Sequence, residues 1–254
     1  MNNFIRLISR FIFGKLLPRW AYPVLRGPLR GARFILGSLA GEGGGASVYF
    51  GLIEPEQTAA LAESLKKGMT FFDVGANVGY YSLLGSRLVG PQGKVVAFEP
   101  ALQNLDYLYR HTVLNKAGNV TIMSAACADG LSMAIFSAGE NSATGHLAAE
   151  PGPGQKTPVL TVALDEVAQR LAVWPAVIKI DVEGAELSVL RGARGVLDQA
   201  RPKIFLSTHS AGLREAYLAY LKEHGYAYEI LSRDKLDPSE FLAVHSEEKN
   251  NKGK

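Results

Sequence analysis

Two acidic residues, Asp73 and Glu99, each close an apolar run of this 254-residue chain, and a glycine-bearing turn follows the first. The turn contains Gly75, Asn77 and Gly79, and a helix-patterned stretch comes after it. Glycine lets a backbone adopt positive φ and approach a ligand closely. An acid at the end of the next strand is placed to accept hydrogen bonds from a ribose diol. The spacing predicts a site for an adenosine-containing small molecule.

The residues of the turn favour a cationic ligand over a dinucleotide. A pyrophosphate site uses Gly-x-Gly-x-x-Gly, but here Asn77 takes a glycine position and Asp73 would repel phosphate. S-adenosylmethionine carries an ammonium and a sulfonium and no phosphate. We therefore predict S-adenosylmethionine as the cofactor, with Asp73 facing its amino acid end and Glu99 holding the ribose. The glycine turn and the second acid leave an NAD-dependent oxidoreductase as the alternative.

The predicted cofactor-binding residues come from three strand ends. A side chain for the adenine is expected at the end of the third strand, where Ser124 and backbone amides are available. The full set is Asp73, Gly75, Asn77, Gly79, Glu99 and Ser124.

A fourth strand, Ile178 to Asp181, also ends in a carboxylate. Ligands of open α/β sheets bind beyond the carboxyl ends of the strands, so Asp181 and His209 should reach the same rim as Asp73 and Glu99. Methyl transfer to a hydroxyl requires positioning of the acceptor and removal of its proton. His209 is the predicted base, with Asp181 as its rival or orienting partner. A purely structural loop histidine is the alternative for His209.

A metal-dependent variant stays open at the sequence level. Asp181, Glu183 and His209 are oxygen and nitrogen ligands that suit Mg²⁺ or Mn²⁺ holding an acceptor diol. Nothing in their spacing demands a metal, so none is predicted.

Three separated motifs carry a family resemblance. The segments DVGANVGYYS (73–82), VVAFEP (95–100) and IKIDVEGAELSVLRGA (178–193) together resemble the FkbM family of class I S-adenosylmethionine-dependent methyltransferases. The likeness covers roughly residues 50–230. It implies a Rossmann-like, seven-stranded, mostly parallel sheet with helices on both faces. It also implies methyl transfer, typically to oxygen and often on sugars or natural products, without naming the acceptor. A glycolipid acceptor is expected only if the N-terminal segment binds a lipid surface.

Alternating strand and helix patterns predict the same α/β architecture with right-handed crossovers. Strands are expected at 70–74, 94–98, 120–124, 177–181, 203–207, 226–231 and 240–244, and helices at 56–67, 79–89, 102–115, 185–197 and 213–224. A glycine-rich and proline-rich stretch, 138–158, is interpreted as a mobile loop that shapes the acceptor pocket.

Composition indicates one main domain with extensions. The chain is 47% hydrophobic and 20% charged, which is typical of a globular protein. Its single cysteine, Cys127, excludes an internal disulfide and indicates no oxidising compartment, so a cytoplasmic location is expected. We expect a basic N-terminal segment at 1–41, a Gly-rich linker at 42–47, the methyltransferase domain at 48–246 and a disordered tail at 247–254.

The N-terminal segment is strongly basic, since no acid precedes Glu42. The first 17 residues have apolar positions on one helical side and arginines on the other. Such a helix suits an anionic membrane surface through residues 1–20, but its charges prevent it from spanning a bilayer. Packing on its own domain or on a second subunit is an equal alternative. A nucleic acid partner is not expected, and a non-catalytic membrane-surface protein on this fold is a third reading.

Overall fold

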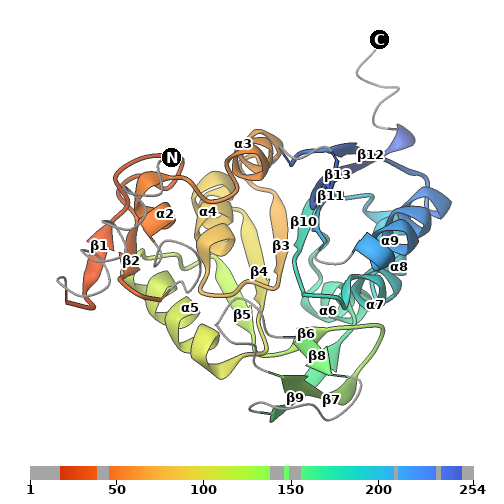
Figure 1. Ribbon diagram of the computed structural model, residues 1–254, viewed down its shortest axis with the longest axis horizontal. Helices are drawn as coiled ribbons and strands as arrows, with labels where there is room; N and C mark the ends of the chain where they lie inside the picture. Colours follow the sequence, from red (N-terminus) through yellow and green to blue (C-terminus); the bar gives the residue numbers. More distant parts are fainter. Residues whose placement is uncertain are drawn as a thin grey trace.

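The computed structural model describes residues 18–38, 46–137, 146–148, 156–208, 211–232 and 236–247. Its centre is a seven-stranded sheet in the order β12-β13-β11-β10-β3-β4-β5 (Figure 1). Neighbouring strands from β11 to β5 run parallel, and β13 runs antiparallel to both β11 and β12. The strands are β3 (Thr70–Val74), β4 (Lys94–Phe98), β5 (Val120–Met123), β10 (Val177–Ile180), β11 (Lys203–Ser207), β12 (Tyr226–Ile230) and β13 (Glu240–His245). The predicted fold class is confirmed.

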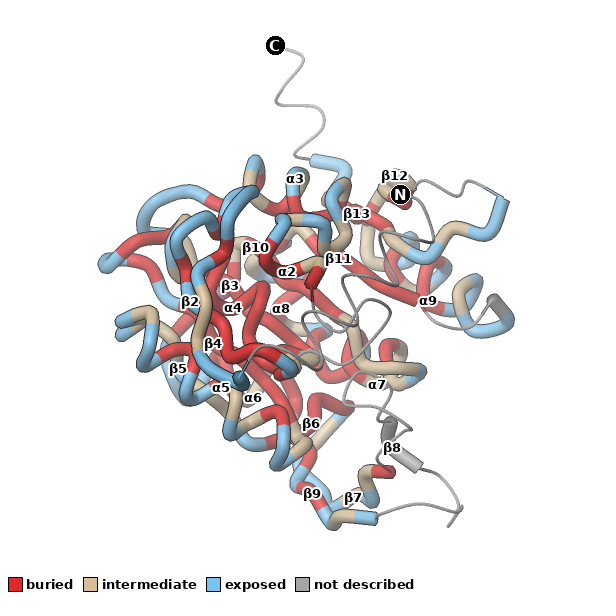
Figure 2. Tube along the Cα trace, turned by 60° about the vertical axis from the view of Figure 1, so that its left-hand side comes forward, coloured by how far each residue is buried: buried red, intermediate tan, exposed pale blue. Residues whose placement is uncertain are grey.

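Two hydrophobic cores lie on opposite faces of this sheet. Phe71 packs into one core and Phe72 into the other, because successive side chains of a strand point to opposite faces. Helices α3 (Pro55–Ser64), α4 (Tyr80–Val89) and α5 (Leu102–Leu114) cover the first face. The second is covered by α6 (Leu164–Leu171), α7 (Glu186–Arg191), α8 (Arg194–Gln199) and α9 (Ala211–Glu223). Figure 2 shows the central strands as buried backbone.

An N-terminal hairpin completes the first core. Strand β1 (Ala21–Pro23) pairs antiparallel with β2 (Arg33–Ile35), and the short helix α2 (Ala46–Phe50) lies close by. Apolar side chains of this region are buried against the domain, among them Val24, Leu29, Ala32, Phe34 and Leu36. Residues 18–38 thus pack on the folded body, although 1–41 was expected to be a segment outside the methyltransferase domain. The expected amphipathic helix at 1–17 and the tail beyond 247 lie outside the described residues.

A smaller sheet, in the order β6-β9-β7-β8, flanks the carboxyl end of β5. It consists of β6 (Ala126–Cys127), β7 (Ser132–Ser137), β8 (His146–Ala148) and β9 (Lys156–Val162). Of the predicted loop at 138–158, only 146–148 and 156–158 fall within the described residues.

The helix expected at 185–197 is divided into α7 and α8. A Cβ on Gly192 would lie 2.0 Å from the backbone oxygen of Ala128, so the chain passes close to the smaller sheet there. The carboxylate of Asp165 on α6 then accepts the amides of Gly195 and Val196, both at 2.8 Å. This side-chain cap starts a new helix. No helix within the described ranges has the length and apolarity needed to cross a membrane.

Candidate active site

The turn after β3 folds against the end of β4 and touches the end of β10. The amides of Gly75 and Ala76 donate to the carbonyl of Phe98 at 3.0 and 2.9 Å. Gly75 has φ +82°, and a Cβ there would lie 1.9 Å from the backbone oxygen of Asp181. Glycine is therefore required at position 75 because two strand ends meet closely, in addition to the positive φ.

Asn77 stands at the centre of the turn with φ +50°. Asparagine tolerates this left-handed conformation better than most residues, and its side-chain oxygen accepts the amide of Val78 at 2.8 Å. Its own amide donates to Glu99 Oε2 at 2.7 Å. Gly79, with φ +95°, precedes α4 and lies against Leu108 of α5. The turn is thereby locked to the acid of the next strand.

Glu99 is only 4% exposed and is held by three donors. Besides Asn77, the amide of Ala101 donates at 2.9 Å and the side-chain amide of Asn104 at 3.2 Å. Burial raises the pKa of Glu99, and these hydrogen bonds oppose the rise. A carboxylate offers about four acceptor positions. Glu99 therefore keeps the capacity to accept a ribose hydroxyl.

Asp73 lies beneath the turn and is 1% exposed. Its Oδ2 accepts the hydroxyl of Ser82 at 2.6 Å, whereas Oδ1 is buried and has no hydrogen-bond partner among the described residues. Burial raises its pKa to about 6, although Lys179 and Ser82 oppose the rise. An acid with an unsatisfied oxygen suits the ammonium of the predicted cofactor, which makes the donor set of this site compatible with S-adenosylmethionine.

A buried lysine connects Asp73 with Asp181. Lys179 is 2% exposed, and its Nζ lies 2.7 Å from Asp181 Oδ2 and 4.7 Å from the ring centroid of Tyr81. Burial lowers the pKa of Lys179, but the carboxylates of Asp181, Glu54 and Asp73 outweigh it and the pKa is raised. Lys179 is not among the site residues predicted from the sequence. A lysine inside the fully buried strand Val177–Ile180 was the available signal.

Of the remaining predicted residues, Ser124 and Asp181 lie at the rim of the site, and His209 lies outside the described residues. Ser124 is exposed directly after β5, where the carbonyl of Met123 accepts the amide of Glu99 at 3.1 Å. Asp181 is adjacent to Gly75, as described above. His209 lies outside the described residues, between β11 and α9. Within the described ranges no group of three or more acidic, histidine or cysteine side chains could hold a metal ion.

His111 on α5 fastens the hairpin to the cofactor turn. Its Nδ1 lies 2.7 Å from the carbonyl of Val78, and its Nε2 lies 3.0 Å from the amide of Ile35 on β2. Nδ1 must therefore carry the proton and Nε2 must accept. Burial lowers the pKa of His111, which favours this neutral form. The N-terminal hairpin is in this way part of the support of the site.

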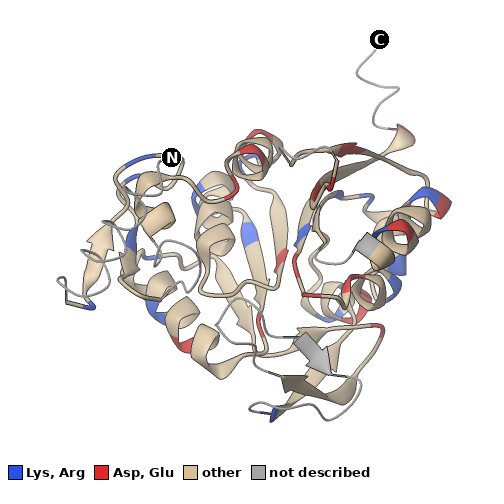
Figure 3. Ribbon diagram, viewed as in Figure 1, with Lys and Arg blue, Asp and Glu red and all other residues tan. Residues whose placement is uncertain are grey.

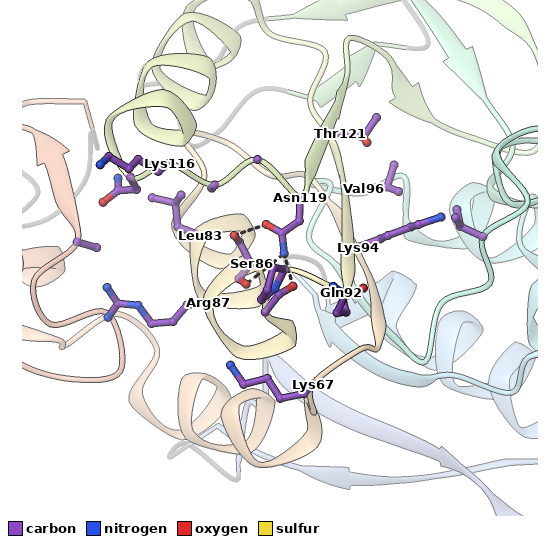
Figure 4. Close-up of a pocket in the computed structure, with 18 of the residues that line it drawn as sticks. Lys67, Leu83, Ser86, Arg87, Gln92, Lys94, Val96, Lys116, Asn119 and Thr121 are labelled. Carbon is purple, nitrogen blue, oxygen red and sulfur yellow. Dashed lines mark hydrogen bonds between the residues drawn. The ribbon is translucent and has the colours of Figure 1, made fainter.

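A separate hollow of about 990 Å³ lies at the opposite, amino end of the strands (Figure 4). Its lining includes Lys67, Arg87, Lys94 and Lys116 and no acid. Arg87 donates to the carbonyls of Pro28 and Arg30 at 3.0 and 2.9 Å, which ties α4 to the hairpin. Because donor and acceptor sites of such sheets lie at the carboxyl ends, this hollow is not part of the candidate active site.

The model of the family described as "Methyltransferase FkbM domain" matches residues 73–228 of this chain. The chain belongs to the FkbM methyltransferase family. It is therefore an S-adenosylmethionine-dependent methyltransferase, and the sequence-based choice of this cofactor over NAD is confirmed. Among curated proteins, none is similar enough in sequence to be matched.

Solved structures support the fold. The FkbM methyltransferase from Methylobacillus flagellatus KT is similar, with a TM-score of 0.50 and 19% identity, over 82% of this chain and 56% of that protein. A putative rRNA-methylase from Clostridium thermocellum has a TM-score of 0.52 and 10% identity, over 75% of this chain and 93% of that protein. At these identities the likeness establishes the shared architecture alone.

Proposed function

We propose that this FkbM methyltransferase transfers a methyl group to a hydroxyl oxygen of a small-molecule, saccharide or glycolipid acceptor. The observation that carries the proposal is the position of Asp181. Asp181 directly follows β10, and its backbone oxygen lies against the Gly75 turn. Its carboxylate is held by Lys179, whose Nζ lies 2.7 Å from Oδ2. An oriented carboxylate beside the cofactor turn can accept a hydrogen bond from an acceptor hydroxyl and so position it.

Each polar group of the rim has a distinct task in this proposal. S-adenosylmethionine, when bound, supplies an electrophilic methyl on a good leaving group. Glu99 accepts the ribose hydroxyls, and the negative charge of Asp73 favours the ammonium of the amino acid end. Ser124 and nearby backbone groups adjoin the adenine. Asp181 orients the acceptor hydroxyl and His209 accepts its proton.

The experiment has a binding part and a turnover part. Calorimetry with S-adenosylhomocysteine and NAD is expected to show micromolar binding of the former and none of the latter. Turnover with methyl-labelled S-adenosylmethionine and a panel of sugars, glycolipids and phenols should fall at least 100-fold in Asp181→Asn and His209→Ala. Affinity for S-adenosylhomocysteine should stay within about threefold in both variants. His224→Ala, just after α9, is the matched control, and full turnover of His209→Ala would remove His209 from the proposal.

A membrane surface is the second part of the proposed function, and exposed apolar side chains favour it. Leu25 and Leu52 are 53% and 47% exposed, and the amide of Leu25 donates to Tyr49 of α2 at 2.8 Å, which brings their two segments together. Exposed Arg26 lies beside them, and Figure 3 shows further basic positions on the hairpin, α4 and α5. We propose a cytoplasmic protein that associates peripherally with anionic membranes through residues 1–20, assisted by these side chains.

Vesicle sedimentation tests this association. Full-length protein should pellet with vesicles containing an anionic lipid but not with neutral ones, and deletion of residues 1–20 should abolish pelleting. Leu25→Ser combined with Leu52→Ser should reduce it severalfold, whereas Leu131→Ser, a change at a 64% exposed leucine just before β7, should have no effect. Equal pelleting of the truncated protein would contradict the role of residues 1–20.

A further inference from the structure

Polar side chains from four neighbouring strands share one face of the sheet. Lys179 of β10 is in register with Asp73 of β3 and with Phe205 of β11. Ser207, two residues after Phe205, is paired with Glu240 at the start of β13. Residues in register point to the same face, and so do residues two apart along a strand. Asp73, Lys179, Ser207 and Glu240 therefore form a row on the face that α3 and α4 cover.

Glu54, just before α3, closes this row from above the sheet. Its Oε2 accepts the hydroxyl of Tyr81 at 2.7 Å and the side-chain amide of Gln57 at 2.5 Å. The ring of Tyr81 in turn lies over the ammonium of Lys179. The chain of contacts runs from Glu54 through Tyr81 to Lys179 and Asp181.

The charge around Glu240 is mostly negative. Burial, followed by the carboxylates of Glu54, Glu56 and Asp181, raises the pKa of Glu240 to about 7, against the opposing effect of the Lys179 ammonium. Glu54 and Glu56 face Glu240 from the start of α3, and Lys179 and Asp181 face it from the end of β10. A cation or a hydrogen-bond donor placed among them would be stabilised.

Ser207 provides an independent sign that this place is a binding site. It is 4% exposed, and its Oγ has no hydrogen-bond partner among the described residues. Buried polar atoms are normally satisfied, so an exception calls for a partner. Ser207 lies between Glu240 on β13 and Asp181, the residue that follows β10, and the three side chains share one face of the sheet.

We propose that Glu240, Ser207 and Asp181 form the acceptor subsite and that Glu240 selects acceptors that present hydroxyl or ammonium groups and disfavours anionic ones. The inference rests on the proposed methyl transfer. Adjacent strands lie about 4.8 Å apart, so β10 and β13 are separated by about 10 Å. A hydroxyl-bearing or amine-bearing group fits between two carboxylates at this spacing, while an acceptor carboxylate or phosphate would be repelled.

The test uses two cofactor analogues, because they probe the subsite without a known acceptor. S-adenosylhomocysteine has a neutral sulfur, and sinefungin carries an ammonium where the transferable methyl is attached. Calorimetry on the full-length protein at pH 8 should show sinefungin binding at least fivefold tighter than S-adenosylhomocysteine. This advantage should shrink at least threefold at pH 6, where Glu240 is protonated, and equally in Glu240→Gln at pH 8.

Glu229→Gln, at an exposed position on β12, is the matched control and should keep the full advantage and its pH dependence. Ser207→Ala should lower sinefungin affinity about twofold to fivefold with unchanged affinity for S-adenosylhomocysteine. An unaltered sinefungin advantage in Glu240→Gln would overturn the acceptor subsite while leaving methyl transfer intact. Absence of binding by both analogues to the natural protein would instead overturn the proposed function, and this inference with it.

Discussion

Single side chains in this site balance charge around the buried ammonium of Lys179. Removing an ammonium and its partner carboxylate from water is costly. A buried ion pair is stable only with good geometry and further hydrogen bonds. Lys179 meets this condition with Asp181 at 2.7 Å and with the face of the Tyr81 ring. The lysine thereby keeps one carboxylate oriented at the rim and another, Asp73, ionisable beneath it. Cofactor and acceptor sides of the site share this one cation.

The first residue-scale prediction concerns Glu99→Gln. The amide nitrogen of glutamine cannot accept the hydrogen bond that Asn77 donates to Oε2 at 2.7 Å, and the charge proposed to hold the ribose is lost. Hydrogen bonds to charged groups contribute about 1.5–3 kcal/mol, so affinity for S-adenosylhomocysteine should fall about 10- to 100-fold in calorimetry. Asp106→Asn, on the exposed side of α5, should bind normally. Retained affinity in Glu99→Gln would exclude Glu99 from the ribose site.

The second residue-scale prediction concerns the pH dependence of stability. Asp73 has a pKa of about 6 in the folded protein, against an ordinary value of 3.8. Between these pH values the folded state holds more protons than the unfolded state, so Asp73 makes stability fall as pH rises from about 4 to about 6. The fall amounts to up to about 3 kcal/mol.

Urea unfolding at pH 4.5 and 6.5 measures this contribution. Asp73→Asn should lack it, so the variant should gain stability relative to the natural protein as pH rises. Glu240 and Glu99, whose pKa values are also raised, act in both proteins and cancel in the comparison. Parallel pH profiles of the free energy of unfolding for the two proteins would show that burial does not raise the pKa of Asp73.

The cofactor and base residues could be proposed from sequence because a turn motif and strand ends are local features. Asp73, Gly75, Asn77, Glu99 and Asp181 do come together at one edge of the sheet. The proposed role of Glu240 in the acceptor subsite could not be predicted from the sequence. It depends on an antiparallel pairing with Ser207, 33 positions earlier. Pairing register is a non-local property that no spacing along the chain reveals.

At the scale of elements, the strand positions followed from buried apolar runs and bordering glycines, and the structure reproduces the predicted strands closely. Other elements, among them α6 and the smaller sheet, were not predicted, and two of the differences have a visible physical reason. The break between α7 and α8 depends on Asp165 and on the approach of Gly192 to Ala128. Hairpin β1–β2 has strands of three residues each, too short for a detectable alternation.

Gly75→Ala is the prediction for the turn element. The new methyl group would lie 1.9 Å from the Asp181 oxygen at a backbone φ of +82°. Both the clash and the left-handed conformation are unfavourable, so urea unfolding should show a loss of about 3 kcal/mol. Gly118→Ala is the matched control, because no atom lies within 4 Å of its Cβ position, and its stability should change by less than about 1 kcal/mol. Equal stabilities for the two variants would contradict the close contact of β3 and β10.

At the scale of the whole molecule, the N-terminal hairpin belongs to the catalytic domain. A protein beginning at residue 18 should fold normally, whereas one beginning at residue 48 should be less stable by more than about 5 kcal/mol. The reason is that Val24, Leu29, Phe34 and Leu36 would no longer cover the first core, and each such side chain contributes about 1.5–3 kcal/mol. Differential scanning calorimetry of the two fragments checks this, and equal melting temperatures would place the domain boundary at the glycine-rich segment after all.

Strand β13 lies between β11 and β12 in the sheet, although β12 precedes it in the chain. During synthesis the native position between β11 and β12 is therefore filled only after β13 emerges from the ribosome, and β12 lacks its native partner before then. The cofactor turn is complete long before this moment, but Glu240 arrives only with the closing strand. A nascent or prematurely terminated chain could thus hold the methyl donor while lacking one wall for the molecule to be methylated.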